Sequence, residues 1–131
     1  MKILIVALSG EVGGAEKILK YCAHYHKSKG YQCDIIIFGK KSSSYWDSFN
    51  VKYLDSLNFN SLLKFINILK NNNYILASSS LILANALLGL LRFLGILKCE
   101  NLIIRESTQV FKRWKLIKLI PIYFLYFLYL M

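Results

Sequence analysis

The fold of this chain is decided by residues 1–30, MKILIVALSGEVGGAEKILKYCAHYHKSKG. The unbroken apolar run over residues 3–8 has the length and the Ile/Val content of a strand buried on both faces, as in a parallel sheet. Residues 9–14 form a glycine-containing turn. From Ala15 the apolar residues recur at helical spacing until Gly30, a glycine of the type that ends helices. This strand, turn and helix predict the first unit of a doubly wound α/β domain.

The remainder of the chain continues the same alternation. Apolar runs of strand length predict further strands at residues 33–39, 51–54, 74–77 and 101–105. Helical periodicity predicts helices at residues 60–72 and 81–94, and Ser78, Ser79 and Ser80 are expected to cap the second of them. Strands that alternate with helices favour an α/β fold, a Rossmann-like parallel sheet flanked by helices on both faces.

Composition narrows the class of protein and of partner. The 131 residues suit one domain, and 56% hydrophobic residues exclude a disordered chain. The net charge of +10, from 17 basic and 7 acidic residues, predicts an anionic partner such as a nucleotide phosphate or an acidic membrane surface. No nucleic-acid-binding fold fits this strand order, so we expect no nucleic-acid partner.

The three cysteines do not form a recognisable site. Cys22, Cys33 and Cys99 lie far apart, and no C-x-x-C pair occurs. This spacing predicts neither a zinc site nor a disulfide framework, so we expect no metal and reduced thiols in a cytoplasmic protein.

The glycine turn has the chemistry of an anion site. Backbone N–H groups at a helix N-terminus point outward, and the helix dipole is positive there. A tight turn without a ligand explains the same residues, and the sequence leaves both interpretations open. The G-x-G-x-x-G fingerprint and the G-x-x-x-x-G-K-[ST] motif are absent, which argues against a dinucleotide-dependent dehydrogenase and a P-loop nucleotidase.

The first forty residues resemble a specific family. A first strand, a Gly-Gly-Ala-Glu turn at residues 13–16 and a helix that ends at Lys29-Gly30-Tyr31 are similar to the N-terminal half of family-4 glycosyltransferases of the GT-B fold. A looser likeness lies at residues 103–107, IIRES, after the fifth predicted strand. The resemblance implies transfer of a sugar, of the hexosyltransferase type, from a nucleotide-sugar to a glycan or lipid-linked acceptor, with no further cofactor.

Carried over by position, the resemblance implies substrate-binding residues in the turn and after the fifth strand. They are Gly13, Gly14, Glu16, Arg105, Glu106 and Ser107. The two glycines would let the backbone approach the substrate, Arg105 would pair with a phosphate, and Glu106 would orient an acceptor hydroxyl. A solvated charge pair at a strand end is the alternative for Arg105 and Glu106. Catalytic residues are not implied for this chain.

The resemblance also implies a missing part. Enzymes of this family use a second domain of similar size for the donor, and residues 1–131 match the N-terminal, acceptor-side domain alone. We therefore expect one domain, with an α/β core over residues 1–109 and a basic, apolar helical tail over residues 110–131. A truncated half-enzyme of this kind should be inactive by itself. The alternative function is a non-catalytic α/β module that binds a membrane surface or a protein partner.

The tail has two interpretations. Residues 119–131, LIPIYFLYFLYLM, carry no charge, and four basic residues precede them. Aromatic residues beside a basic cluster suit a membrane interface, which would place a cytoplasmic protein at the inner face of a membrane. The interpretation we favour is a helix made to pack against the missing half. Thirteen residues are too few to span a bilayer, and residues 74–97 are interpreted as a strand and a buried helix, because Arg92 and three serines interrupt them.

Overall fold

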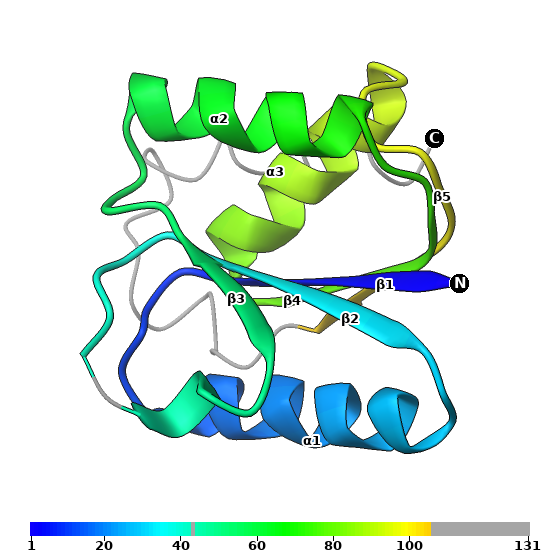
Figure 1. Ribbon diagram of the computed structural model, residues 1–131. Helices are drawn as coiled ribbons and strands as arrows, with labels where there is room; N and C mark the ends of the chain where they lie inside the picture. The colour runs from blue at the N-terminus through cyan, green and yellow to red at the C-terminus, as the bar shows by residue number, and fades with distance from the viewer. Residues whose placement is uncertain (43, 106–131) are drawn as a thin grey trace.

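The computed structural model describes residues 1–42 and 44–105, which form a five-stranded parallel sheet between helices (Figure 1). The strands are β1 (Lys2–Ala7), β2 (Gln32–Ile37), β3 (Asn50–Tyr53), β4 (Tyr74–Ser80) and β5 (Cys99–Arg105). The helices are α1 (Gly14–Ser28), α2 (Phe59–Lys70) and α3 (Ile82–Phe93), with a short 3₁₀ helix, η1 (Ser44–Trp46). This arrangement confirms the predicted Rossmann-like α/β fold.

The strand order β3-β2-β1-β4-β5 places the first strand at the centre. Ile3 of β1 is in register with Cys33 of β2 on one side and with Leu76 of β4 on the other. The chain therefore runs outward from β1 to β3, and then returns through α2 to the opposite side of β1. The carboxyl ends of β1 and β4 consequently flank a topological switch point, where ligands of open α/β sheets bind.

Two helices cover one face of the sheet. Figure 1 shows α2 and α3 together on this face, with α1 on the other. Between the sheet and these two helices lies a core of aliphatic and aromatic side chains that includes Leu4, Val6, Phe65, Leu69 and Leu88, all fully buried. Phe65 packs edge-to-face on Phe38, with ring centroids 5.2 Å apart, a favourable aromatic geometry.

The other face is covered by α1 and by η1. Its core contains Ile3, Ile5, Leu19 and Ala23, and the fully buried Trp46 of η1 fills the space beside them. The 3₁₀ turn that inserts this tryptophan is a finding of the structure.

The helix ends follow local rules, with one correction. Gly30 has φ +83, a left-handed conformation that suits glycine after α1. Asn58 caps α2, since its Oδ1 accepts a hydrogen bond of 2.8 Å from the N–H of Ser61. The expected serine cap of the next helix is wrong: β4 continues through Ser80, and the N-cap of α3 is Leu81, without a side-chain hydrogen bond. The buried serines belong to the sheet because the pairing with β5 extends to Ser80.

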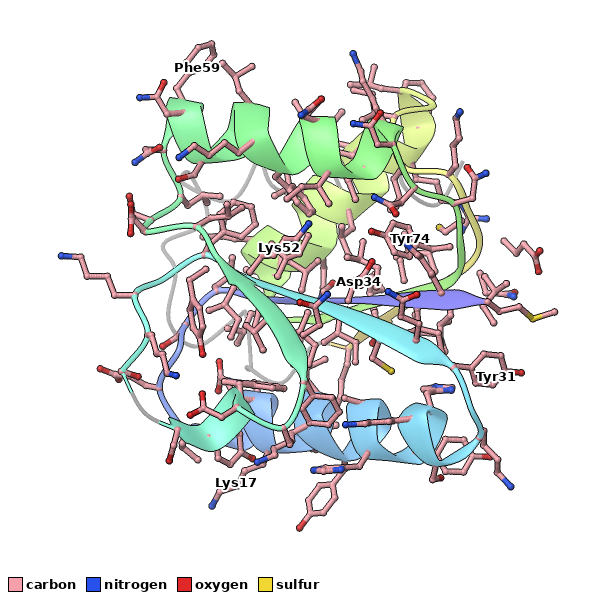
Figure 2. The ribbon with its side chains drawn as sticks, viewed as in Figure 1. Lys17, Tyr31, Asp34, Lys52, Phe59 and Tyr74 are labelled. Atoms are coloured by element: carbon pink, nitrogen blue, oxygen red, sulfur yellow. The ribbon has the colours of Figure 1, made fainter. Side chains whose placement is uncertain are left out.

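A polar contact ties the start of β2 to β4. Tyr74 and Asp34 lie close together near the end of the sheet (Figure 2), and the Tyr74 hydroxyl donates to the Asp34 Oδ2 at 3.4 Å. The ammonium group of Lys2 lies 3.9 Å from the same carboxylate oxygen. Burial, with help from this carboxylate, raises the pKa of the Tyr74 phenol far above its ordinary value.

Residues 74–97 contain β4 and α3, as predicted, and not one long helix. Over residues 1–42 and 44–105 no helix has both the length and the hydropathy needed to cross a membrane. The predictions made for the tail, residues 110–131, lie outside the described residues.

Candidate functional site at the carboxyl edge of the sheet

A cleft of about 550 Å³ lies at the switch point of the sheet. It is lined by Gly14, Ala15, Glu16 and Ile18 from the start of α1, by Leu81 from the turn between β4 and α3, and by Arg105 from the end of β5. Three segments that are distant in sequence therefore meet here, because the carboxyl ends of parallel strands share one edge of the sheet. We call this hollow the edge cleft.

The start of α1 presents its backbone to the edge cleft. Gly13 is the N-cap residue, and no side chain caps this helix. The first N–H groups of α1 have no partner inside the helix, and the dipole is positive at this end. Glu16 is buried, with 6% of its surface exposed, and its carboxylate folds back over Gly13. A Cβ on Gly13 would lie 2.6 Å from the Glu16 Oε2, so glycine leaves room for this carboxylate.

Arg105 brings a cation to the opposite wall. Its backbone carbonyl accepts hydrogen bonds from the N–H of Leu81 at 3.3 Å and from the Asn85 Nδ2 at 3.0 Å, which fix the end of β5. The Asn85 Oδ1 in turn accepts a hydrogen bond of 2.7 Å from the Ser79 hydroxyl. Within the described part of the chain, the Arg105 guanidinium has neither a hydrogen bond nor an ion pair. The Arg105 backbone is therefore held in place, while its guanidinium is available to bind an anionic ligand.

Strained backbone marks the third wall. Leu81 has φ +88 and ψ 139, a conformation that L-residues with side chains rarely adopt. Such strain costs about 1–3 kcal/mol, and it is concentrated at functional sites where the surrounding structure holds it in place. The side-chain hydroxyl of the neighbouring Ser80 is buried and has no partner among the described residues. The turn between β4 and α3 was not predicted as part of a site.

The glycines of the first turn have unequal roles. A Cβ on Gly10 would lie 2.5 Å from the backbone oxygen of Lys40, so this glycine permits close contact between the loops that follow β1 and β2. A Cβ on Gly14 would meet nothing within 4 Å. The sequence pointed to Gly13 and Gly14. The structure adds Gly10, whose contact across the sheet leaves no signal in local spacing.

The predicted substrate-binding residues are in part brought together. Gly14, Glu16 and Arg105 line the edge cleft, and Gly13 lies directly beneath the Glu16 carboxylate. Glu106 and Ser107 lie outside the described residues. Leu81 and Ile18 are lining residues that sequence reasoning missed. No local signal marks the turn between β4 and α3, because the switch point depends on the order of the strands in the sheet.

The cysteines and histidines lie elsewhere. Cys22, Cys33 and Cys99 are not disulfide-bonded, and burial raises the pKa of both the Cys33 and the Cys99 thiols. His26 of α1 is half-buried, and its Nδ1 has no hydrogen-bond partner among the described residues. In the part of the chain that the structure describes, no group of three or more His, Cys, Asp or Glu residues is placed to hold a metal ion.

Comparisons of the chain with protein-family models, with curated proteins and with solved structures found no match.

Proposed function

We propose that this chain is the acceptor-side domain of a glycosyltransferase, and that its edge cleft holds the sugar-phosphate part of a nucleotide-sugar beside a glycan or lipid-linked acceptor. The observation that carries the proposal is the placement of Arg105, Glu16 and the start of α1 around one cleft at the switch point. The likeness of residues 13–16 to the turn of family-4 enzymes supports the same assignment.

The mixed charge of the edge cleft favours a ligand with both phosphate and hydroxyl groups. Arg105 and the N–H groups of α1 offer donors to an anion. Glu16 offers acceptors, which a sugar hydroxyl can satisfy and a bare phosphate cannot. No ion pair joins Glu16 to Arg105, so each retains its capacity to bind a ligand. A sugar phosphate matches both halves of this arrangement.

The family likeness limits what the chain should do by itself. Sugar transfer requires the acceptor hydroxyl and the donor's anomeric carbon to be held together, and enzymes of the GT-B fold do this between two domains. We therefore expect the 131-residue chain to bind part of the substrate and to transfer no sugar unless a donor-binding domain is supplied.

The experiment measures binding of inorganic pyrophosphate and of a panel of UDP-hexoses by calorimetry, at low and at high salt. We expect weak, salt-sensitive binding that Arg105→Ala reduces by about tenfold or more, because a charge-assisted bidentate contact is lost. Arg92→Ala is the matched control. The Arg92 side chain donates to the Glu100 carbonyl oxygen at 3.1 Å, at the opposite end of β5.

Three results would contradict the proposal. Equal loss of binding in both arginine variants would indicate a general charge effect, and no binding by the parent chain would remove the site. Affinity for anionic vesicles without affinity for pyrophosphate or UDP-hexoses would favour the alternative, a membrane-surface module. That alternative is supported by the outer side of α1, where Tyr21 and Tyr25 are exposed beside Lys17 and Lys29.

A further inference from the structure

The face of the sheet that carries α1 is incompletely covered. Ile103 of β5 is in register with Ser78, and Ser78 is in register with Ile5 of the core beneath α1. These three residues therefore belong to the same face of the sheet. Ile5 is fully buried, whereas 55% of the Ile103 surface is exposed, although it lies inside a strand. Among the described residues α1 packs against β1, β2 and β4, and no helix covers β5 on this face.

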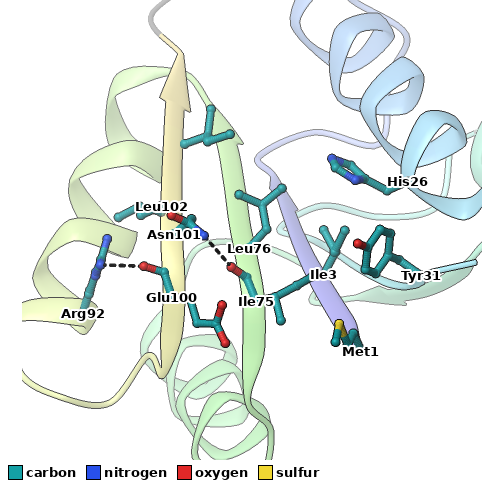
Figure 3. Close-up of a pocket in the computed structure, with 11 residues that line it drawn as sticks. Met1, Ile3, His26, Tyr31, Ile75, Leu76, Arg92, Glu100, Asn101 and Leu102 are labelled. Atoms are coloured by element: carbon teal, nitrogen blue, oxygen red, sulfur yellow. Dashed lines mark hydrogen bonds between the residues drawn. The ribbon is translucent and has the colours of Figure 1, made fainter. Parts of the chain in front are cut away.

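The uncovered area is a hollow of about 710 Å³ between α1 and β5 (Figure 3). Its floor is formed by Ile75, Leu76 and Ile103, and its far wall by His26 and Tyr31. Figure 3 shows His26 and Tyr31 on one side of the hollow and Glu100 and Asn101 of β5 on the other. We call it the α1–β5 slot.

The edge cleft adjoins the carboxyl end of the same gap. Ile18 of α1 lines the edge cleft and His26, two turns further along the same helix, lines the slot. On β5, Arg105 lines the edge cleft and Ile103 lines the slot. The slot thus lies in the gap between one helix and one strand, a shape that a second helix parallel to α1 would fill.

The chain itself leaves β5 at the mouth of this gap. Residues 106–131 follow Arg105, whose position at the carboxyl edge is fixed by Leu81 and Asn85. A helical tail over residues 110–131, kinked at Pro121, would be about 33 Å long along its path. The seven residues of β5 extend for about 23 Å. The tail therefore has ample length to return along the whole strand.

The apolar part of the tail matches the floor of the slot, whose walls also carry His26, Arg92, Glu100 and Asn101. Residues 119–131 contain no charged side chain, and the slot floor is aliphatic. Burial of this floor would remove exposed apolar surface at about 25 cal/mol per Å². We propose that residues 110–131 pack as a helix in the α1–β5 slot of their own chain and complete the second layer of the domain. This proposal does not depend on the proposed function.

The test measures thiol accessibility in the full chain. Cys22 and Cys99 are replaced by serine, and the buried Cys33 is retained. Ile103→Cys is then labelled with a maleimide reagent, and Phe59→Cys is the matched control, because 73% of the Phe59 surface is exposed at the start of α2. We expect labelling at position 103 to be about tenfold or more slower than at position 59, since a packed helix must first open.

A tail variant and two added conditions separate the possible occupants. Leu125→Asp, in the Ile103→Cys background, should restore fast labelling without loss of the far-ultraviolet circular dichroism of the sheet and helices. The slow labelling of the thiol at position 103 should stay constant over about a hundredfold range of protein concentration. Fast labelling at position 103 in the parent tail would overturn the proposal. Protection that requires high concentration would assign the slot to a second copy, and protection that requires anionic vesicles would assign it to a lipid surface; each would overturn it.

Discussion

The two faces of the sheet differ in how they are completed. On one face, α2 and α3 enclose an aliphatic core in which Leu4, Phe65 and Leu88 are fully buried. On the other, α1 packs against β1, β2 and β4 and the buried Trp46 belongs to the same core, while Ile103 of β5 stays half exposed. The first face is therefore finished by the described residues, and the second has one long helix and one gap.

This difference separates a closely packed core from the two hollows of the molecule. The two-helix face carries close-packed contacts that depend on shape. The α1 face carries the start of α1, the edge cleft and the α1–β5 slot. Substitutions in either core should therefore change mainly the free energy of unfolding, whereas those that line the two hollows should change binding or accessibility.

The largest expected effect tests packing on the two-helix face. Phe65→Ala should lower the free energy of unfolding by about 3–5 kcal/mol, because it opens a cavity beside Phe38. Leu63→Ala, in the same helix but with half of its surface exposed, should change it by less than about 1 kcal/mol. Urea unfolding followed by circular dichroism measures both. A small effect of Phe65→Ala would show that this face is loosely packed and would remove the contrast between the faces.

A second effect depends on pH and concerns Tyr74. The pKa of its phenol is raised by burial and by Asp34, so the folded chain retains this proton above the ordinary value of 10.0 while the unfolded chain loses it. Fewer protons are then bound in the unfolded state, and stability falls as pH rises through that value. Tyr74→Phe should flatten this decline between about pH 9 and pH 11 in urea unfolding. Parallel pH profiles for parent and variant would contradict the assignment.

The smallest expected effect concerns Trp46, the largest buried side chain in the core of the α1 face. The Trp46 Nε1–H is buried without a partner in the described part of the chain, so its removal relieves an unpaired donor. Trp46→Phe should consequently change the free energy of unfolding by less than about 1.5 kcal/mol. The smaller ring buries less apolar surface, but the cost of desolvating the unpaired indole N–H is also removed, and the two effects offset each other. Trp46→Ala, which opens a cavity, should cost about 3–5 kcal/mol. Thermal unfolding monitored by calorimetry distinguishes the two; equal large losses would reveal a partner for the indole.

Much of the secondary structure was predictable, because its signals are local. The apolar run at residues 3–8 and the periodicity from Ala15 to Gly30 identify β1 and α1 to within two residues. The extent of β4 was mispredicted, because Ser78, Ser79 and Ser80 have the composition of a cap but occupy a paired strand. Their placement depends on the register with β5, which no local pattern reports.

The candidate site was predictable to a lesser degree. Gly13, Gly14, Glu16 and Arg105 were selected from the turn and from a family likeness, and the fold places Gly14, Glu16 and Arg105 around one cleft. Leu81 and Gly10 could not be selected in this way. The role of Gly10 arises from a close approach to Lys40, and that of Leu81 from its position across the switch point.

The sequence by itself determined that this protein is an α/β domain with a parallel sheet. Helices show a periodic spacing of apolar residues, and strands buried on both faces show unbroken apolar runs, so both can be recognised in the order of the residues. Strand order, the position of Trp46, the meeting of Arg105 with the start of α1 and the uneven cover of the two faces were decided by the tertiary structure. These features depend on contacts between residues far apart in the chain, and the free energy of such contacts is a property of the packed molecule.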